Sequence, residues 1–274
     1  MLISELFTYT FLRHAFFAAI ISSIMCGIIG TYIVTRRMVF IGGGITHASF
    51  GGIGIGYFLG MPPLLFAIIF ATLSAFGIEF MSKKMEIRND SAIAVLWALG
   101  MAIGIIFIHI TPGYSPNLMS YLFGSILSVT PSEINLMLLL LILIGAFVFI
   151  FAKPILFIAF DESFARTLQY PVNFINYSML ILSSLVIVSS IKIVGIILLL
   201  SLITIPQNIA NLFTDRFYLI MLYSAIIAVF GSITGLVISY FLKIPSGAAI
   251  IFTLIIIYGI ARLIKKTLLT RTKL

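Results

Sequence analysis

Charged residues are scarce in this chain. They make up 9% of its 274 residues, whereas 62% of the residues are hydrophobic. Soluble globular domains are about 25% charged, so this composition excludes an ordinary soluble protein and predicts one all-α, polytopic membrane domain over residues 1–274. The formal net charge is +8. Because the basic residues flank apolar runs, this charge indicates membrane topology rather than nucleic-acid binding.

Several kinds of chemistry are also missing from the sequence. The chain has 1 cysteine, Cys26, which excludes an internal disulfide and a cysteine metal cluster. There is no Gly-x-x-x-x-Gly-Lys-Ser/Thr phosphate loop and no His-Glu-x-x-His zinc motif. No cluster of carboxylates lies in the middle of an apolar run, where a proton-driven carrier would need one. These absences argue against an enzyme and against ATP binding through a phosphate loop.

Long apolar runs dominate what is present. A transmembrane helix needs roughly 20 predominantly apolar residues. The second candidate run is short and glycine-rich, and only the Ile191–Lys192 region separates the sixth from the seventh, so eight spans are the alternative to nine. The predicted spans are Phe16–Thr35, Gly43–Leu59, Pro63–Met81, Ala92–Ile110, Ile134–Phe151, Phe174–Ile191, Ile193–Leu212, Tyr218–Leu242 and Ala248–Ile264.

The basic residues are distributed unevenly between the predicted loops. If the loops alternate and Lys153–Asn173 is cytoplasmic, every Lys and Arg except Arg13, Lys192 and Lys243 falls on the cytoplasmic side. This bias follows the positive-inside rule. It predicts a cytoplasmic C-terminus and, with nine spans, an external N-terminus. The longest external loop, Thr111–Thr130, contains an apolar piece that is too short to span and is expected to form a re-entrant or surface helix.

A short polar segment interrupts the apolar runs near the middle of the chain. Asp161–Leu168 is charged and amphipathic, and the topology places it on the cytoplasmic side. In a chain with so little other soluble material, this segment is expected to contact a partner in the aqueous phase.

Two polar features lie inside predicted spans. His47 follows a glycine-rich stretch, and a neutral imidazole binds first-row divalent metals well; the alternative is a histidine hydrogen-bonded to a neighbouring helix. Pro206 breaks the helical hydrogen-bond pattern next to Thr204 and Asn208, which is typical either of a transport route or of a kink satisfied by neighbouring helices. The glycines around Gly52–Gly56 likewise indicate either close helix packing or an irregular, pore-lining helix start.

Taken in order, several segments resemble the integral-membrane permeases of the manganese/zinc/iron uptake ABC transporters. The resemblance covers roughly Arg13 to Arg262. The segments that carry it are Arg36–Ala48, Tyr114–Leu118, Leu122–Leu127, Asp161–Arg166, and Lys192–Gly195 with Pro206 and Ala210.

The resemblance implies a fold similar to that of the vitamin B12 and siderophore importer permeases. It also implies a permease dimer in a prokaryotic plasma (inner) membrane, cytoplasmic ATPase subunits, an extracytoplasmic metal-binding protein, no permanently bound cofactor and a transported divalent metal ion. Residues 161–172 would be the cytoplasmic segment that docks on the ATPase. The implied coupling residues are Asp161, Glu162, Phe164, Ala165, Arg166 and Leu168, and the implied pathway residues are His47, Thr204, Pro206 and Asn208.

The chain departs from this family pattern at two positions. Gly43 stands where the family often carries an acidic residue four positions before the histidine, which leaves the choice among manganese, zinc and ferrous iron open. Gln169 stands where a glycine usually follows the coupling-segment leucine, and it predicts a modified exit turn that ends at Pro171. The alternatives to a metal-ion permease are a permease for siderophores or other metal chelates and, less favoured, an ion-driven secondary carrier or channel.

Overall fold

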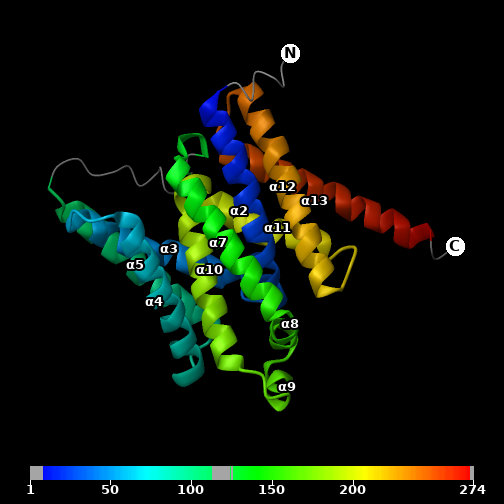
Figure 1. Ribbon diagram of the computed structural model, residues 1–274, viewed down its shortest axis with the longest axis horizontal. Coiled ribbons are helices and arrows are strands. Elements are labelled where there is room, and N and C mark those ends of the chain that lie inside the picture. The colour runs from blue at the N-terminus through cyan, green and yellow to red at the C-terminus, as the bar shows by residue number, and fades with distance from the viewer. Residues whose placement is uncertain (1–8, 113–123, 125, 272–274) are drawn as a thin grey trace.

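The long apolar runs of the sequence form helices in the computed structural model, which describes residues 9–112, 124 and 126–271 (Figure 1). Within these residues, eight helices are long and apolar enough to cross a membrane. They are α2 (Thr10–Thr35), α3 (Val39–Phe58), α4 (Pro63–Lys84), α5 (Asn89–Ile110), α7 (Pro131–Ile150), α10 (Val172–Val194), α12 (Phe217–Leu242) and α13 (Ser246–Arg271).

The remaining predicted span is a shorter helix. Helix α11 (Ile196–Ala210) has 15 residues and at 1.5 Å per residue reaches about 22 Å, less than the roughly 30 Å thickness of a bilayer's apolar core. The sequence placed the break before it at Ile191–Lys192, but α10 continues to Val194 and the chain turns at Gly195. Gly195 has a φ of 81°, which glycine adopts without a Cβ clash. Among the described residues, eight of the nine predicted spans are therefore long helices, and the ninth is a short one.

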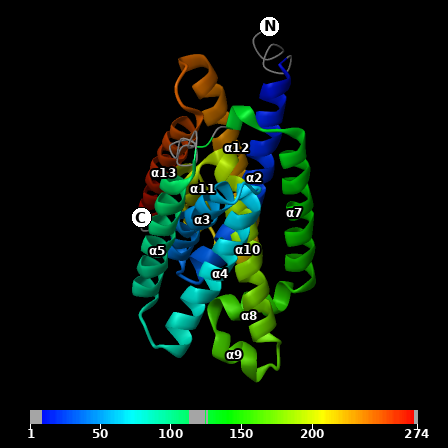
Figure 2. The same ribbon diagram turned by 90° about the vertical axis from the view of Figure 1, so that its left-hand side faces the viewer.

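Three short elements complete the described chain: η1 (Ile126–Ser128), α8 (Ala152–Phe160) and α9 (Glu162–Thr167). Most of the predicted external apolar piece, Leu118–Leu127, lies outside the described residues, and η1 covers only its end. Helices α8 and α9 lie at the end of the bundle opposite the start of α2 (Figure 2).

Helices α3, α4 and α5 pack on one another and form what we term the α3–α5 lobe, on one side of the molecule in Figure 1. Glycines allow their backbones to touch. A Cβ built at Gly54 of α3 would lie 2.6 Å from the carbonyl oxygen of Gly104 in α5, and one at Gly52 would collide with the Phe66 carbonyl of α4. The glycines near Gly52–Gly56 therefore serve close packing, the first of the two interpretations of this stretch.

Burial separates central helices from peripheral ones. In the apolar 18-residue stretches of α2, α3 and α10, at least 72% of the residues are buried. The corresponding share is at most 33% in α4, α5, α7, α12 and α13. His47 lies on one of the central helices, α3, and Arg36 directly follows another, α2. The peripheral helices expose the apolar side chains that a surrounding bilayer would cover.

Candidate functional site

Helix α9 is a single short helix fixed at its start by a side-chain cap. The Asp161 carboxylate accepts a hydrogen bond from the Phe164 backbone N–H at 3.0 Å. Asp161 itself is extended, with φ −149° and ψ 101°, so the chain breaks sharply between α8 and α9. An aspartate N-cap satisfies one of the free N–H groups of the first turn and favours helix formation there. The short helix thus begins directly after Asp161, the first residue of the polar segment seen in the sequence.

The end of α9 is also well defined. The Gln169 N–H donates to the Arg166 carbonyl at 3.0 Å, and the Tyr170 N–H donates to the Ala165 carbonyl at 3.3 Å. This pair of bonds is the Schellman motif, whose key residue is left-handed. Gln169 has a φ of 59°, so it occupies the position that a glycine would favour. The predicted modification of the exit turn is therefore wrong for the backbone. The turn is an ordinary Schellman turn in which a glutamine takes the left-handed position that favours glycine.

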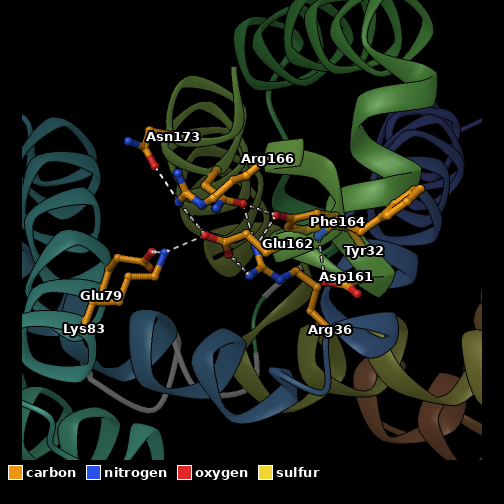
Figure 3. A network of polar contacts seen from close by, with 10 residues as sticks. Tyr32, Arg36, Glu79, Lys83, Asp161, Glu162, Phe164, Arg166 and Asn173 are labelled. Atoms are coloured by element: carbon orange, nitrogen blue, oxygen red, sulfur yellow. Dashed lines mark hydrogen bonds and ion pairs between the residues drawn. The ribbon is translucent and has the colours of Figure 1, made fainter. Parts of the chain in front are cut away.

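A network of charged groups joins α9 to the rest of the bundle (Figure 3). The Glu162 carboxylate pairs with Arg166 of α9 at 2.8 Å, with Arg36 at 2.9 Å and with Lys83 of α4 at 3.4 Å. Lys83 also pairs with Glu79 at 2.6 Å, one turn earlier in α4. Three basic residues that the sequence assigns to the same side of the protein thus converge on one carboxylate.

Arg36 extends the network into the central helices. Its Nη1 donates to the Tyr32 hydroxyl at 2.8 Å and to the Asn176 side-chain oxygen of α10 at 2.6 Å. The Tyr32 hydroxyl donates to the same Asn176 oxygen at 3.1 Å. Helix α9 is thus held through Glu162 and Arg36 against α2 and α10.

These contacts keep Glu162 ionised. Its side chain is 23% exposed. Partial burial alone would raise the pKa of Glu162, but the hydrogen bond from Arg166 and the charges of Lys83 and Arg36 outweigh it and lower the pKa to about 2. The carboxylate therefore stays charged throughout the physiological pH range.

The other predicted coupling residues divide into a buried and an exposed set. Ala165 is fully buried on the inner face of α9, so it packs within the chain instead of offering a contact to a partner. Phe164 is 48% exposed and Leu168 is 43% exposed. The Phe164 ring stands edge-on to Phe157 of α8, with centroids 5.7 Å apart. Two apolar side chains of α9 are therefore exposed among polar ones, and an aromatic ring of α8 packs against one of them.

His47 lies in α3 against an aromatic ring of α5. Its imidazole stacks on Trp97 with ring centroids 4.0 Å apart and planes 6° apart. Its Nδ1 is buried without a hydrogen-bond partner among the described residues, so the alternative of a histidine satisfied by a neighbouring helix finds no support at this atom. A Cβ built at Gly43 would lie 3.6 Å from the Leu200 side chain, which is an ordinary van der Waals distance. Among the described residues, no group of at least 3 His, Cys, Asp or Glu side chains gathers here or elsewhere.

The carbonyl that Pro206 leaves without a backbone donor in α11 is satisfied by Gln207, a neighbour of the predicted pathway residues. Pro206 lacks the N–H that would bond to the Leu202 carbonyl, one turn earlier. The Gln207 side chain donates to that carbonyl at 3.3 Å and to the Cys26 carbonyl of α2 at 2.9 Å. A Cβ at Gly30 would collide with the Gln207 amide, so Gly30 provides the space for it.

The predicted polar group of α11 does not form one surface. Pro206 is buried, Asn208 is exposed, and the hydroxyl of Thr204 donates to the Leu200 carbonyl of its own helix at 2.7 Å. The sequence signal that could have identified Gln207 is its place directly after an intrahelical proline, where an amide can replace the lost donor.

Comparison with known proteins assigns the architecture to a class. Residues 8–265 match the ABC 3 transport family. The chain belongs to this family. A manganese transport system membrane protein, MntC, of Listeria innocua is 33% identical over 261 residues, which cover 95% of this chain and 93% of the relative. The resemblance seen in the sequence is thereby confirmed.

Solved structures agree with this ABC 3 assignment. PsaBC from Streptococcus pneumoniae, determined in complex with a Fab, superimposes with a TM-score of 0.85 at 30% identity and covers 94% of this chain and 93% of the matched chain. An inward-facing ABC transporter of the metal-chelate type superimposes with a TM-score of 0.72 at 14% identity, over 95% of this chain and 88% of the other. The second likeness confirms the predicted permease fold.

Proposed function

We propose that this ABC 3 chain is the permease subunit of an ATP-driven importer for divalent transition-metal ions. The observation that carries the proposal is α9. It is a short, capped helix that presents Phe164 and Leu168 outward at the end of the bundle where Arg36, Lys83 and Arg166 gather. Exposed apolar side chains on a short helix outside the predicted spans are expected to be covered by a protein partner.

The partner on α9 would be a cytoplasmic ATPase. The positive-inside rule assigns the end that holds Arg36, Lys83 and Arg166 to the cytoplasm, and with it the C-terminus. The sequence contains no phosphate loop, so ATP hydrolysis is expected in the separate subunit. The segment 161–172 would then receive the movement of that subunit. The membrane would be the plasma (inner) membrane of a prokaryote.

The transported ion would pass His47. A neutral imidazole binds first-row divalent metals well, and the Nδ1 of His47 has no partner among the described residues. One imidazole is too few ligands to hold a divalent ion, so a second copy of the chain is expected to complete the pathway. An extracytoplasmic metal-binding protein would deliver the ion. Manganese, which MntC of Listeria innocua transports by its name, is the first ion to test, followed by zinc and ferrous iron.

Co-purification tests the central claim. The tagged chain is expressed with its genomic neighbours and purified in mild detergent, and the ATPase subunit is expected to follow it. Phe164→Ala should weaken that association, because it removes the exposed apolar contact of α9. Phe149→Ala is the matched control, because Phe149 is an 85% exposed phenylalanine of α7 outside the coupling segment.

Transport assays with the complete complex then identify the cargo class. Uptake of free manganese, zinc or ferrous iron is expected, and uptake of a siderophore-bound metal alone would favour the metal-chelate alternative. If the unmodified chain never retains an ATPase under conditions that preserve its dimer, the proposed function is wrong. Transport by the lone chain in liposomes would instead favour a secondary carrier.

A further inference from the structure

Lys83 stands between two carboxylates that belong to different parts of the molecule (Figure 3). It contacts Glu79 of its own helix at 2.6 Å and Glu162 of α9 at 3.4 Å. Its side chain is 46% exposed, so it can reorient between the two without leaving water. The shorter contact lies within α4, and the longer one crosses to the coupling segment.

This longer contact is the route by which the ion pairs of α9 reach the α3–α5 lobe. Among the described residues, the other cations on Glu162 are Arg36, which follows α2, and Arg166, which lies on α9 itself. Neither of these belongs to the lobe. In the part of the chain that the structure describes, Lys83 is therefore the residue through which an ion pair connects α9 to α4.

The pairing is also exchangeable. If Lys83 leaves Glu162, the carboxylate keeps Arg166 at 2.8 Å and Arg36 at 2.9 Å, while Lys83 keeps Glu79 at 2.6 Å. No charge is left unpaired, so the contact can break and form again at small cost. Exposed ion pairs generally contribute little to stability, which suits this contact to a switching role better than to a structural one.

The lobe to which Lys83 belongs is closely packed inside and borders a cavity at one edge. Its helices touch through glycine backbones, as at Gly54 and Gly104. Between the lobe and α10, by contrast, lies a cavity of about 170 Å³ lined by Tyr57 and Leu64 on one side and Val188 and Ile191 on the other. Close packing resists deformation and voids weaken it, so this boundary is where the lobe would move most easily as a unit. The lobe carries His47.

We propose that the Lys83–Glu162 ion pair is an exchangeable contact that passes movement of α9 to the α3–α5 lobe and hence to His47. Lys83 is then a positioning residue for coupling between ATP hydrolysis and transport. This inference rests on the proposed function, in which an ATPase moves α9.

The test uses the complete transporter, with its ATPase, in liposomes. Lys83→Met removes the charge and keeps the apolar stem, and Lys84→Met removes an equal charge from the next position of the same helix. Both the rate of ATP hydrolysis and the rate of manganese uptake are measured. For Lys83→Met we expect normal assembly and a several-fold lower ratio of ions transported to ATP hydrolysed. Lys84→Met should keep the original ratio, and Lys83→Arg should restore it.

The possible failures are distinguishable. An unchanged ratio in Lys83→Met, or an equal fall in Lys84→Met, would overturn the coupling role while leaving the ATPase assignment intact. A Lys83→Met chain that no longer assembles would also overturn it, because Lys83 would then be a structural residue. If the unmodified chain binds no ATPase, the proposed function itself fails, before any variant is considered.

Discussion

Replacing Glu162 with glutamine should weaken the anchoring of α9 by a predictable amount. The change keeps the size of the side chain and removes the charge that Arg36, Lys83 and Arg166 share. Lowering of the pKa from 4.5 to about 2 corresponds to an upper limit of about 3 kcal/mol of stabilisation. Because the site is partly open to solvent, screening reduces this to about 1–2 kcal/mol.

Thermal melting of the purified protein in detergent measures this effect. Near neutral pH, Glu162→Gln should lower the melting temperature by roughly 2–8 °C, whereas Glu86→Gln, at an exposed position, should leave it unchanged. The pKa of Glu162 is lower in the folded protein than in the unfolded chain, so its stabilisation is present above pH 4.5 and disappears as the pH falls toward about 2. The difference between Glu162→Gln and the unmodified protein should vanish over that window. Equal melting temperatures at neutral pH, or a difference that persists at low pH, would refute this account of the network.

Three further substitutions test other parts of the site. His47→Ala should reduce uptake at limiting metal and preserve ATPase association, while His109→Ala, at the exposed end of α5, should change neither; unchanged uptake would make His47 a packing residue. Gln207→Leu leaves the Leu202 carbonyl without a donor and should destabilise the protein by about 1–2 kcal/mol in melting experiments. An unaltered melting temperature would show that water or relaxation of α11 replaces the amide. Gln169→Gly relieves a left-handed residue and should stabilise the protein by about 1 kcal/mol; a loss of stability would mean that the glutamine side chain contributes a contact that outweighs the strain.

The membrane helices were predictable because their signal is local. An apolar run long enough to cross a bilayer has to become a helix there, since the backbone polar groups have no other partners. The start of α9 was predictable for a similar reason: Asp161 ends one apolar run and is a strong N-cap residue. The break at Gly195 was missed by a few residues because a lysine at position 192 gave a stronger polar signal than the glycine that makes the turn.

The polar network was not predictable, because its members are distant in the sequence. Glu162 meets Arg36 and Lys83, which lie far earlier in the chain, and no local pattern indicates which cations will reach it. Its pairing with Arg166 was accessible, because residues one turn apart on a helix are neighbours. The same reasoning predicts the pair between Glu79 and Lys83, which the structure confirms. The contacts of Glu162 with Arg36 and Lys83 are decided by how the helices pack and not by sequence spacing.

One copy of this chain supplies all the described charged groups that hold α9, but it supplies few of the ligands that a transported metal ion would need. The groups that hold α9 are all present in one copy and are paired with one another. At the proposed pathway, His47 stacks on Trp97 and belongs to no group of at least 3 His, Cys, Asp or Glu side chains among the described residues, and Gly43 offers space but no ligand. Manganese favours carboxylate and water ligands, whereas imidazole suits zinc and iron. If two copies of His47 supply the protein ligands, we expect zinc or ferrous iron to compete more strongly with manganese here than in relatives that carry an acidic residue at the Gly43 position. Ion selectivity is then a property in which we expect this permease to differ from such relatives.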